Sequence, residues 1–150
     1  MTAVATSLDQ LTIDLTEEIH VRAPIDKAFA ALIEELGPAN RNHDENPMPM
    51  MLEAWPGGRW FRDLGNANDH LWAHVQAIKV PTLLEISGPL MMSFAVASNI
   101  QYRLKEVDSG TLITLKHSAL GLSPDGFRER LVPGLTLIVN RARQRAERAQ

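Results

Sequence analysis

The sequence predicts an α+β fold in which a sheet of antiparallel strands is covered by a long C-terminal helix. Several stretches between residues 11 and 119 alternate apolar and polar residues with a period of two, as half-buried strands do. The last stretch, residues 123–150, instead repeats apolar residues at spacings of three and four, which places them on one side of a helix. Because this apolar stripe needs a partner surface, we expect the helix to lie across the sheet.

Composition limits the classes of protein to which the chain can belong. Its 150 residues, 45% of them hydrophobic and 22% charged, suit one globular domain over residues 1–150. Cysteine is absent, which excludes disulfides and thiolate chemistry and fits a cytoplasmic location. No stretch has the apolar length of a signal peptide or a membrane span, and a net charge of -3 argues against a nucleic-acid surface. We therefore expect a cytoplasmic protein with no membrane span and no nucleic-acid partner.

The first third of the chain predicts a strand, a helix and a loop. Residues 11–21 alternate as a strand does, and residues 24–36 carry an apolar stripe at helical spacing that ends at Gly-Pro, residues 37–38. Residues 39–49 are rich in Asn, His, Asp, Glu and Pro and have no periodicity. We expect this segment to be a loop that lies over an opening.

Six further strands complete the predicted sheet. They are residues 50–54, 59–63, 70–80, 83–87, 100–105 and 111–119. Short turns join most of them, and the clearest hairpin turns at Asp108-Ser109-Gly110. Consecutive strands joined in this way pair antiparallel, so the sheet should be antiparallel.

The C-terminal stretch predicts two helical pieces. Ser123 reads as an N-cap before Pro124 and Asp125, and a short helix from Pro124 should end near Leu131, because Pro133-Gly134 interrupts it before the main helix. The opposite side, which includes Arg141, is expected to face solvent. The buried stripe consists of Leu131, Leu135, Ile138, Val139, Ala142 and Ala146.

Four segments resemble landmarks of START-like (SRPBCC) proteins. They are residues 19–29 (IHVRAPIDKAF), 56–60 (PGGRW), 75–78 (VQAI, before Pro81) and 110–117 (GTLITLKH). The similarity is closest to the branch named after the activator of the heat-shock protein ATPase and spans roughly residues 12–148. It implies a single START-like domain with a helix-grip fold, in which a curved antiparallel sheet of about seven strands wraps round the C-terminal helix and leaves a cavity. Similar proteins often have Gly-Trp where this chain has Gly134-Leu135, which leaves that part of the cavity less filled.

The large apolar side chains supply the candidate ligand-binding residues. Aromatic side chains bury a large area and methionine adapts to irregular partners, so both suit an apolar pocket, although an ordinary core uses them equally. With the geometry that the resemblance implies, the candidate ligand-binding residues are Trp60, Trp72, Met91, Phe94, Tyr102, His117 and Leu135.

Catalytic and metal-binding residues have weaker signals. His117 shares a face with Ile113 and Leu115 and is interpreted first as a hydrogen-bonded core histidine, with proton transfer beside Tyr102 as the alternative. His70 and His74 lie on one predicted strand, where they would point the same way about 13 Å apart, too far for one ion. No serine lies in a Gly-x-Ser-x-Gly context. We expect no metal and no cofactor, and the catalytic residues, if any, are unknown.

Three functions stay open at this point. The leading interpretation is binding of a small hydrophobic or aromatic ligand, or a lipid, between the sheet and the C-terminal helix. The resemblance also implies two alternatives, a polyketide cyclase/aromatase-like enzyme and a co-chaperone-like protein-interaction module. The sequence leaves open whether the chain forms a homodimer.

Overall fold

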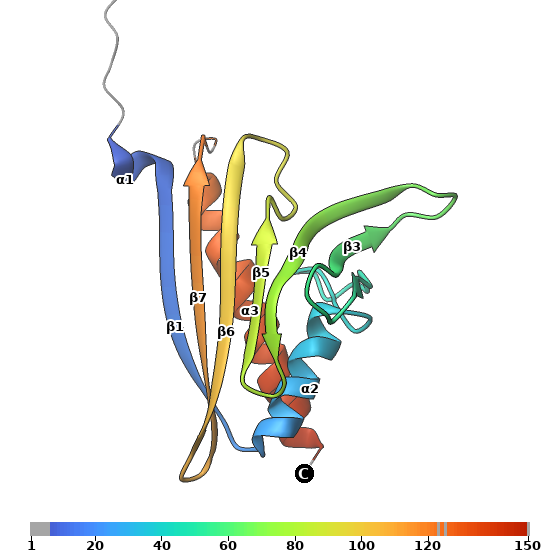
Figure 1. Ribbon diagram of the computed structural model, residues 1–150, viewed down its shortest axis with the longest axis vertical. Helices are drawn as coiled ribbons and strands as arrows, with labels where there is room; N and C mark the ends of the chain where they lie inside the picture. Colours follow the sequence, from blue (N-terminus) through green and yellow to red (C-terminus); the bar gives the residue numbers. More distant parts are fainter. Residues whose placement is uncertain (1–6, 123, 125, 150) are drawn as a thin grey trace, which may run out of the picture.

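A seven-stranded antiparallel sheet forms the larger part of the structure (Figure 1). The computed structural model describes residues 7–122, 124 and 126–149, and of residues 127, 128 and 130–132 it describes only the backbone. The strand order is β1-β7-β6-β5-β4-β3-β2, with every neighbouring pair antiparallel. The strands are β1 (Thr12–Val21), β2 (Met51–Leu52), β3 (Arg59–Asp63), β4 (Asp69–Lys79), β5 (Leu83–Gly88), β6 (Val96–Val107) and β7 (Gly110–Gly121).

Two helices, α2 (Ile25–Leu36) and α3 (Phe127–Arg148), lie on the same face of this sheet and pack against each other. We call this the inner face. Figure 1 shows α3 running behind the strands toward α2. The β3–β4 hairpin projects to the right, above α2 in this view. The short helix α1 (Leu8–Leu11), which the sequence analysis did not predict, precedes β1. The α+β class and the helix-grip arrangement of sheet and C-terminal helix are thereby confirmed.

The C-terminal helix differs from its prediction in being continuous. α3 begins at Phe127 and passes through Pro133 without a break, whereas the sequence predicted an interruption there. Proline's fixed φ is compatible with a helix, and its missing N–H costs one intrahelical bond. The carbonyl group that loses this bond is that of Glu129, and since Glu129 is exposed, water can satisfy it. Ser123 and Asp125 lie outside the described residues, so the predicted N-cap stays a prediction.

The apolar stripe of α3 forms part of the core. Leu135, Val139, Ala142 and Ala146 are buried, and Ile138 is half-buried, as the helical spacing predicts. The side chain of Leu131 lies outside the described part of the chain. Arg141 corrects the prediction of a solvated opposite side, since only 4% of its side chain is exposed. Its long side chain reaches a loop that covers this part of the helix, a contact that helical periodicity alone does not reveal.

A β-bulge between β3 and β4 reverses the direction of the side chains beyond it. Trp60 pairs with Ala73 and Phe61 pairs with Leu71, so Trp72 is the extra residue. His70 therefore lies on the inner face with Trp72, whereas His74 is exposed on the outer face opposite Arg59. The sequence prediction that both histidines point the same way is wrong, because period two holds only where the pairing is regular.

Candidate ligand-binding cavity

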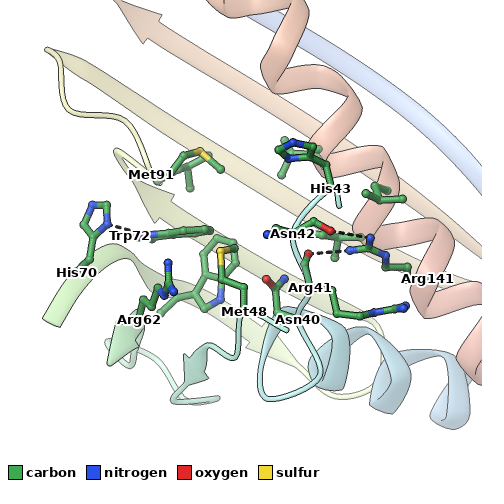
Figure 2. Close-up of a pocket in the computed structure, with 16 residues that line it drawn as sticks. Asn40, Arg41, Asn42, His43, Met48, Arg62, His70, Trp72, Met91 and Arg141 are labelled. Atoms are coloured by element: carbon green, nitrogen blue, oxygen red, sulfur yellow. Dashed lines mark hydrogen bonds between the residues drawn. The ribbon is translucent and has the colours of Figure 1, made fainter. Parts of the chain in front are cut away.

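A cavity of about 500 Å³ lies between the inner face of β3 and β4, the loop of residues 40–48 and α3 (Figure 2). The sequence predicted that the loop after α2 lies over an opening, and in the structure this loop forms one wall of the cavity. The lining residues are Asn40, Arg41, Asn42, His43 and Met48 from the loop, Trp60, Arg62, His70 and Trp72 from the strands, Leu90 and Met91 after β5, and Gly134, Leu135, Leu137, Ile138 and Arg141 from α3.

Two tryptophans form the strand wall. The rings of Trp60 and Trp72 lie edge to face, with centroids 5.1 Å apart and planes at 78°. The indole N–H of Trp60 donates to the carbonyl oxygen of Leu36 at 2.7 Å, and that of Trp72 donates to Nδ1 of His70 at 3.2 Å. Since both indole N–H groups already have acceptors within the protein, the two rings offer the cavity an apolar surface.

The loop wall is fixed to α3 by one arginine. The guanidinium of Arg141 donates to the carbonyl oxygens of Arg41 and Asn42 at 2.7 and 2.9 Å. It also forms an ion pair with Glu45 at 2.7 Å, and this hydrogen bond is the main cause that lowers the pKa of the Glu45 carboxyl. Figure 2 shows the two contacts to the main chain as dashed lines. A buried charge is thus used to hold the loop's backbone in place.

The polar part of the lining is cationic or neutral. No Asp or Glu is among the described residues that line the cavity, whereas Arg62 and His70 lie side by side in it as cross-strand partners on β3 and β4. Asn40 is buried, and its amide Nδ2 donates to the carbonyl oxygen of Glu35 at 3.0 Å. This bond fixes the amide orientation and leaves Oδ1 as an acceptor without a partner among the described residues.

The structure brings four of the seven predicted ligand-binding residues to the cavity. Trp60, Trp72, Met91 and Leu135 line it. Phe94 does not line it and instead borders a narrow apolar crevice beside Ile13 and Ala119. Tyr102 and His117 are also absent from the lining.

Tyr102 and His117 lie deeper in the core, on the inner face of β6 and β7. Each has 0% of its surface exposed. Tyr102 pairs with Leu115 and His117 with Ile100, so the two are diagonal neighbours, as the count from the hairpin turn predicts. Both side chains are enclosed by the core, so neither has surface left for a ligand in the cavity.

His117 is a core histidine, as interpreted, but the hydrogen bond expected of it is not found among the described residues. Neither ring nitrogen of His117 has a hydrogen-bond partner there, nor does the hydroxyl of Tyr102. Burial lowers the pKa of His117 to about 4 and raises the pKa of the Tyr102 phenol, because both charged forms are disfavoured away from water. At neutral pH both groups are therefore uncharged.

Sequence reasoning missed the polar lining of the cavity. Arg62 follows Trp60 by two residues and His70 precedes Trp72 by two, so strand periodicity could have placed each beside its tryptophan. Asn40, His43 and Arg141 have no comparable signal, because their position depends on how the loop meets α3.

The described residues form neither a metal site nor a membrane-spanning helix. Within residues 7–122, 124 and 126–149, no three His, Asp or Glu side chains are placed to hold a metal ion together. Over the same part of the chain, no helix combines the length and the apolar character needed to cross a bilayer.

Comparison with known proteins relates the chain to others through its fold. No protein-family model matches the sequence, and no curated protein sequence matches it. Among solved structures, the di-domain ARO/CYC StfQ from the steffimycin biosynthetic pathway superposes with a TM-score of 0.68 at 13% identity. That match covers 95% of this chain but 53% of StfQ, so the chain spans about half the length of that protein.

Two other structures match over nearly their whole length. An uncharacterised protein from Rhizobium leguminosarum has a TM-score of 0.69 at 17% identity, covering 91% of this chain and 95% of that one. A Bacillus halodurans protein has a TM-score of 0.65 at 22% identity, covering 91% and 99%. These likenesses establish a shared fold. The START-like (SRPBCC) resemblance, and its assignment to the branch of the heat-shock protein ATPase activator, stay predictions.

Proposed function

We propose that the protein binds a small apolar or aromatic molecule in the cavity between β3, β4, the loop of residues 40–48 and α3. The observation that carries this proposal is a cavity of about 500 Å³ with an apolar wall formed by Trp60 and Trp72. Small-molecule sites have volumes of roughly 300–1,000 Å³ and are lined mainly by apolar side chains, with a few polar groups that orient the ligand. Asn40, Arg62 and His70 are such groups here.

The ligand-binding residues that we propose are therefore fewer than the sequence predicted. Trp60, Trp72, Met91 and Leu135 are kept, because they line the cavity. Phe94, Tyr102 and His117 are not, because a ligand in the cavity would not reach them without a rearrangement of the core.

Tryptophan fluorescence tests this proposal. Trp55 is 57% exposed and lies outside the lining, so a Trp55→Phe background leaves emission from Trp60 and Trp72. We expect a saturable change in that emission on titration with at least one member of a panel of flavonoids, aromatic ketides and fatty acids. The relative affinities decide between aromatic molecules and lipids. An unchanged emission throughout the panel would contradict the proposal.

An enzymatic function of the polyketide cyclase/aromatase kind is the second candidate. Its support is the fold shared with the di-domain ARO/CYC StfQ and the presence of an ionisable side chain, His70, in the cavity. The pair first considered for catalysis, His117 and Tyr102, lies outside the lining, so an enzyme of this architecture would use other groups. Turnover of a ligand found in the fluorescence screen, lost in His70→Gln with binding retained, is the result that would favour this function.

The co-chaperone alternative has a smaller feature in its support. Exposed Met51 and Leu71 flank Phe61 in one cross-strand row on the outer face of β2, β3 and β4. A row of three apolar side chains is a modest surface beside the cavity, so we place ligand binding first.

A further inference from the structure

We propose that the cavity selects a carboxylic acid with an aromatic body, whose carboxylate is bound by Arg62 with His70 beside it. This inference rests on the proposed function and names the class of ligand that the same site would take. It follows from the distribution of charged partners around the lining.

Arg62 is the cation of the lining that has no counter-charge. Arg41 and Arg141 both pair with Glu45, and His43 lies 3.5 Å from Asp44. Arg62 is half-buried, and its side chain has neither an ion pair nor a hydrogen bond to any described residue. A guanidinium has five N–H donors, and next to an apolar wall an anionic acceptor satisfies them better than a neutral one.

His70 adds a second donor at the same place. It is the cross-strand partner of Arg62, so the two side chains are neighbours on the inner face of the β3–β4 hairpin. Its Nδ1 accepts the hydrogen bond from the Trp72 indole at 3.2 Å, which requires that the ring hydrogen of the neutral imidazole be on Nε2. Trp72 therefore keeps His70 in the tautomer whose remaining nitrogen donates.

The tryptophan wall determines what the anion can be attached to. Figure 2 shows Arg62 and His70 beside Trp72 on the strand side of the cavity, opposite Asn40 and Arg141. The indole N–H groups of Trp60 and Trp72 are already used, so among these four strand residues Arg62 and His70 are the donors for an anion. A flat aromatic ring can pack on the indoles while its carboxylate takes the planar fork of the guanidinium.

The test compares two ligands that differ only in charge. Isothermal titration of the full chain with 2-naphthoate and with methyl 2-naphthoate should show the acid binding about tenfold or more tighter than the ester. Raising sodium chloride from about 50 to about 500 mM should weaken binding of the acid and leave the ester unchanged. Arg62→Met should remove the preference for the acid with little effect on the ester, and Arg62→Lys should retain part of it. The matched control is Arg103→Met, an exposed arginine on β6, which should retain the full preference.

The outcomes separate this inference from the function on which it rests. Equal affinity for acid and ester in the wild-type protein, or an acid preference that survives Arg62→Met, overturns the inference and leaves an apolar binding cavity in place. Failure of both naphthyl compounds to bind overturns it as well. The fluorescence panel of neutral flavonoids and ketides then decides separately whether the cavity binds anything. Should Arg62→Met fail to fold, the wild-type salt dependence and Arg62→Lys decide the question.

Discussion

The guanidinium of Arg141 donates a hydrogen bond of 2.7 Å to the carbonyl oxygen of Arg41, a residue that lies 100 positions earlier in the chain. The contact joins the long C-terminal helix to the loop that follows α2, and both elements line the cavity. It is made to the main chain, so the loop's conformation depends on one side chain of the helix. The shape of the cavity therefore depends on Arg141, although no apolar contact is involved.

Replacing Arg141 with Met should destabilise the protein and weaken ligand binding. The substitution leaves the carbonyl oxygens of Arg41 and Asn42 without their donor, which costs about 2–4 kcal/mol of the free energy of unfolding. Urea unfolding measures this change, and fluorescence titration in the Trp55→Phe background measures binding. Arg148→Met, on the exposed last turn of the same helix, is the control and should change stability by about 0.5 kcal/mol or less. Equal effects of the two substitutions would show that the loop does not depend on Arg141.

Leu135→Trp should close the cavity while keeping the fold. Leu135 is 2% exposed and lines the cavity, so a larger side chain can extend into space that the leucine leaves free. We expect ligand binding to fall by at least about tenfold, with the free energy of unfolding changed by less than about 1.5 kcal/mol. Leu135→Asp is the contrasting variant and should destabilise by about 3 kcal/mol or more, because it buries an unpaired charge. Unchanged ligand affinity in Leu135→Trp would place the binding site elsewhere.

The stability of the protein should fall with acid partly through His117. Its pKa is about 4 in the folded protein, against 6.5 for the free side chain, so between these values the unfolded chain binds a proton that the folded one does not. Stability from this group is complete above pH 6.5 and decreases as the pH falls toward 4, by about 3 kcal/mol in all. In His117→Leu this component should be absent, so its urea midpoint should fall less between pH 7 and pH 4.5 than that of the wild type.

The control for this experiment is His74→Leu, which removes an exposed histidine from the outer face. Carboxylates whose pKa is lowered in the fold, such as Glu45, contribute their own loss in acid, and they do so equally in all three proteins. Only the difference between the wild type and His117→Leu in how far the urea midpoint falls with pH is therefore assigned to His117. If the urea midpoints of the wild type and His117→Leu fall equally between pH 7 and pH 4.5, the folded and unfolded states bind the His117 proton equally well, which would contradict the prediction.

Gly88→Ala should disturb the strand wall of the cavity. A methyl group at Gly88 would lie 2.4 Å from the carbonyl oxygen of Trp72 and 2.6 Å from the Cα of Ala73, so β4 would have to shift at the bulge. We expect a loss of about 1–3 kcal/mol in unfolding free energy and a changed tryptophan emission spectrum. Gly134→Ala is the matched control, because nothing lies within 4 Å of the added methyl and the residue is helical. That variant should be neutral or stabilised by up to about 1 kcal/mol, and an equal loss in both would argue against the close approach at Gly88.

Local pattern was sufficient to predict most of the elements. Period-two alternation located β1, and the turn and proline residues around them located β3 and β4, each to within about two residues. Helical spacing identified the buried stripe of α3. These predictions succeed because an apolar side chain on a regular strand or helix has one buried direction, which the spacing reveals. The antiparallel pairing of consecutive strands from β2 to β7 also followed from short connections. The pairing of β1 with β7 joins strands from opposite ends of the chain and has no such local signal.

The cavity depended on contacts that no local pattern contains. The bulge at Trp72 placed His70 inside and His74 outside, and the core encloses Tyr102 and His117 away from the cavity. Arg141 was counted with the solvated side of its helix and is buried under a loop from the other end of the chain. The sequence by itself thus determined which apolar residues face inward where a strand or helix is regular, because that depends on neighbours two to four positions apart. The tertiary structure decided which inward faces enclose a cavity, because this depends on where separate elements meet and how closely they fill the space between them.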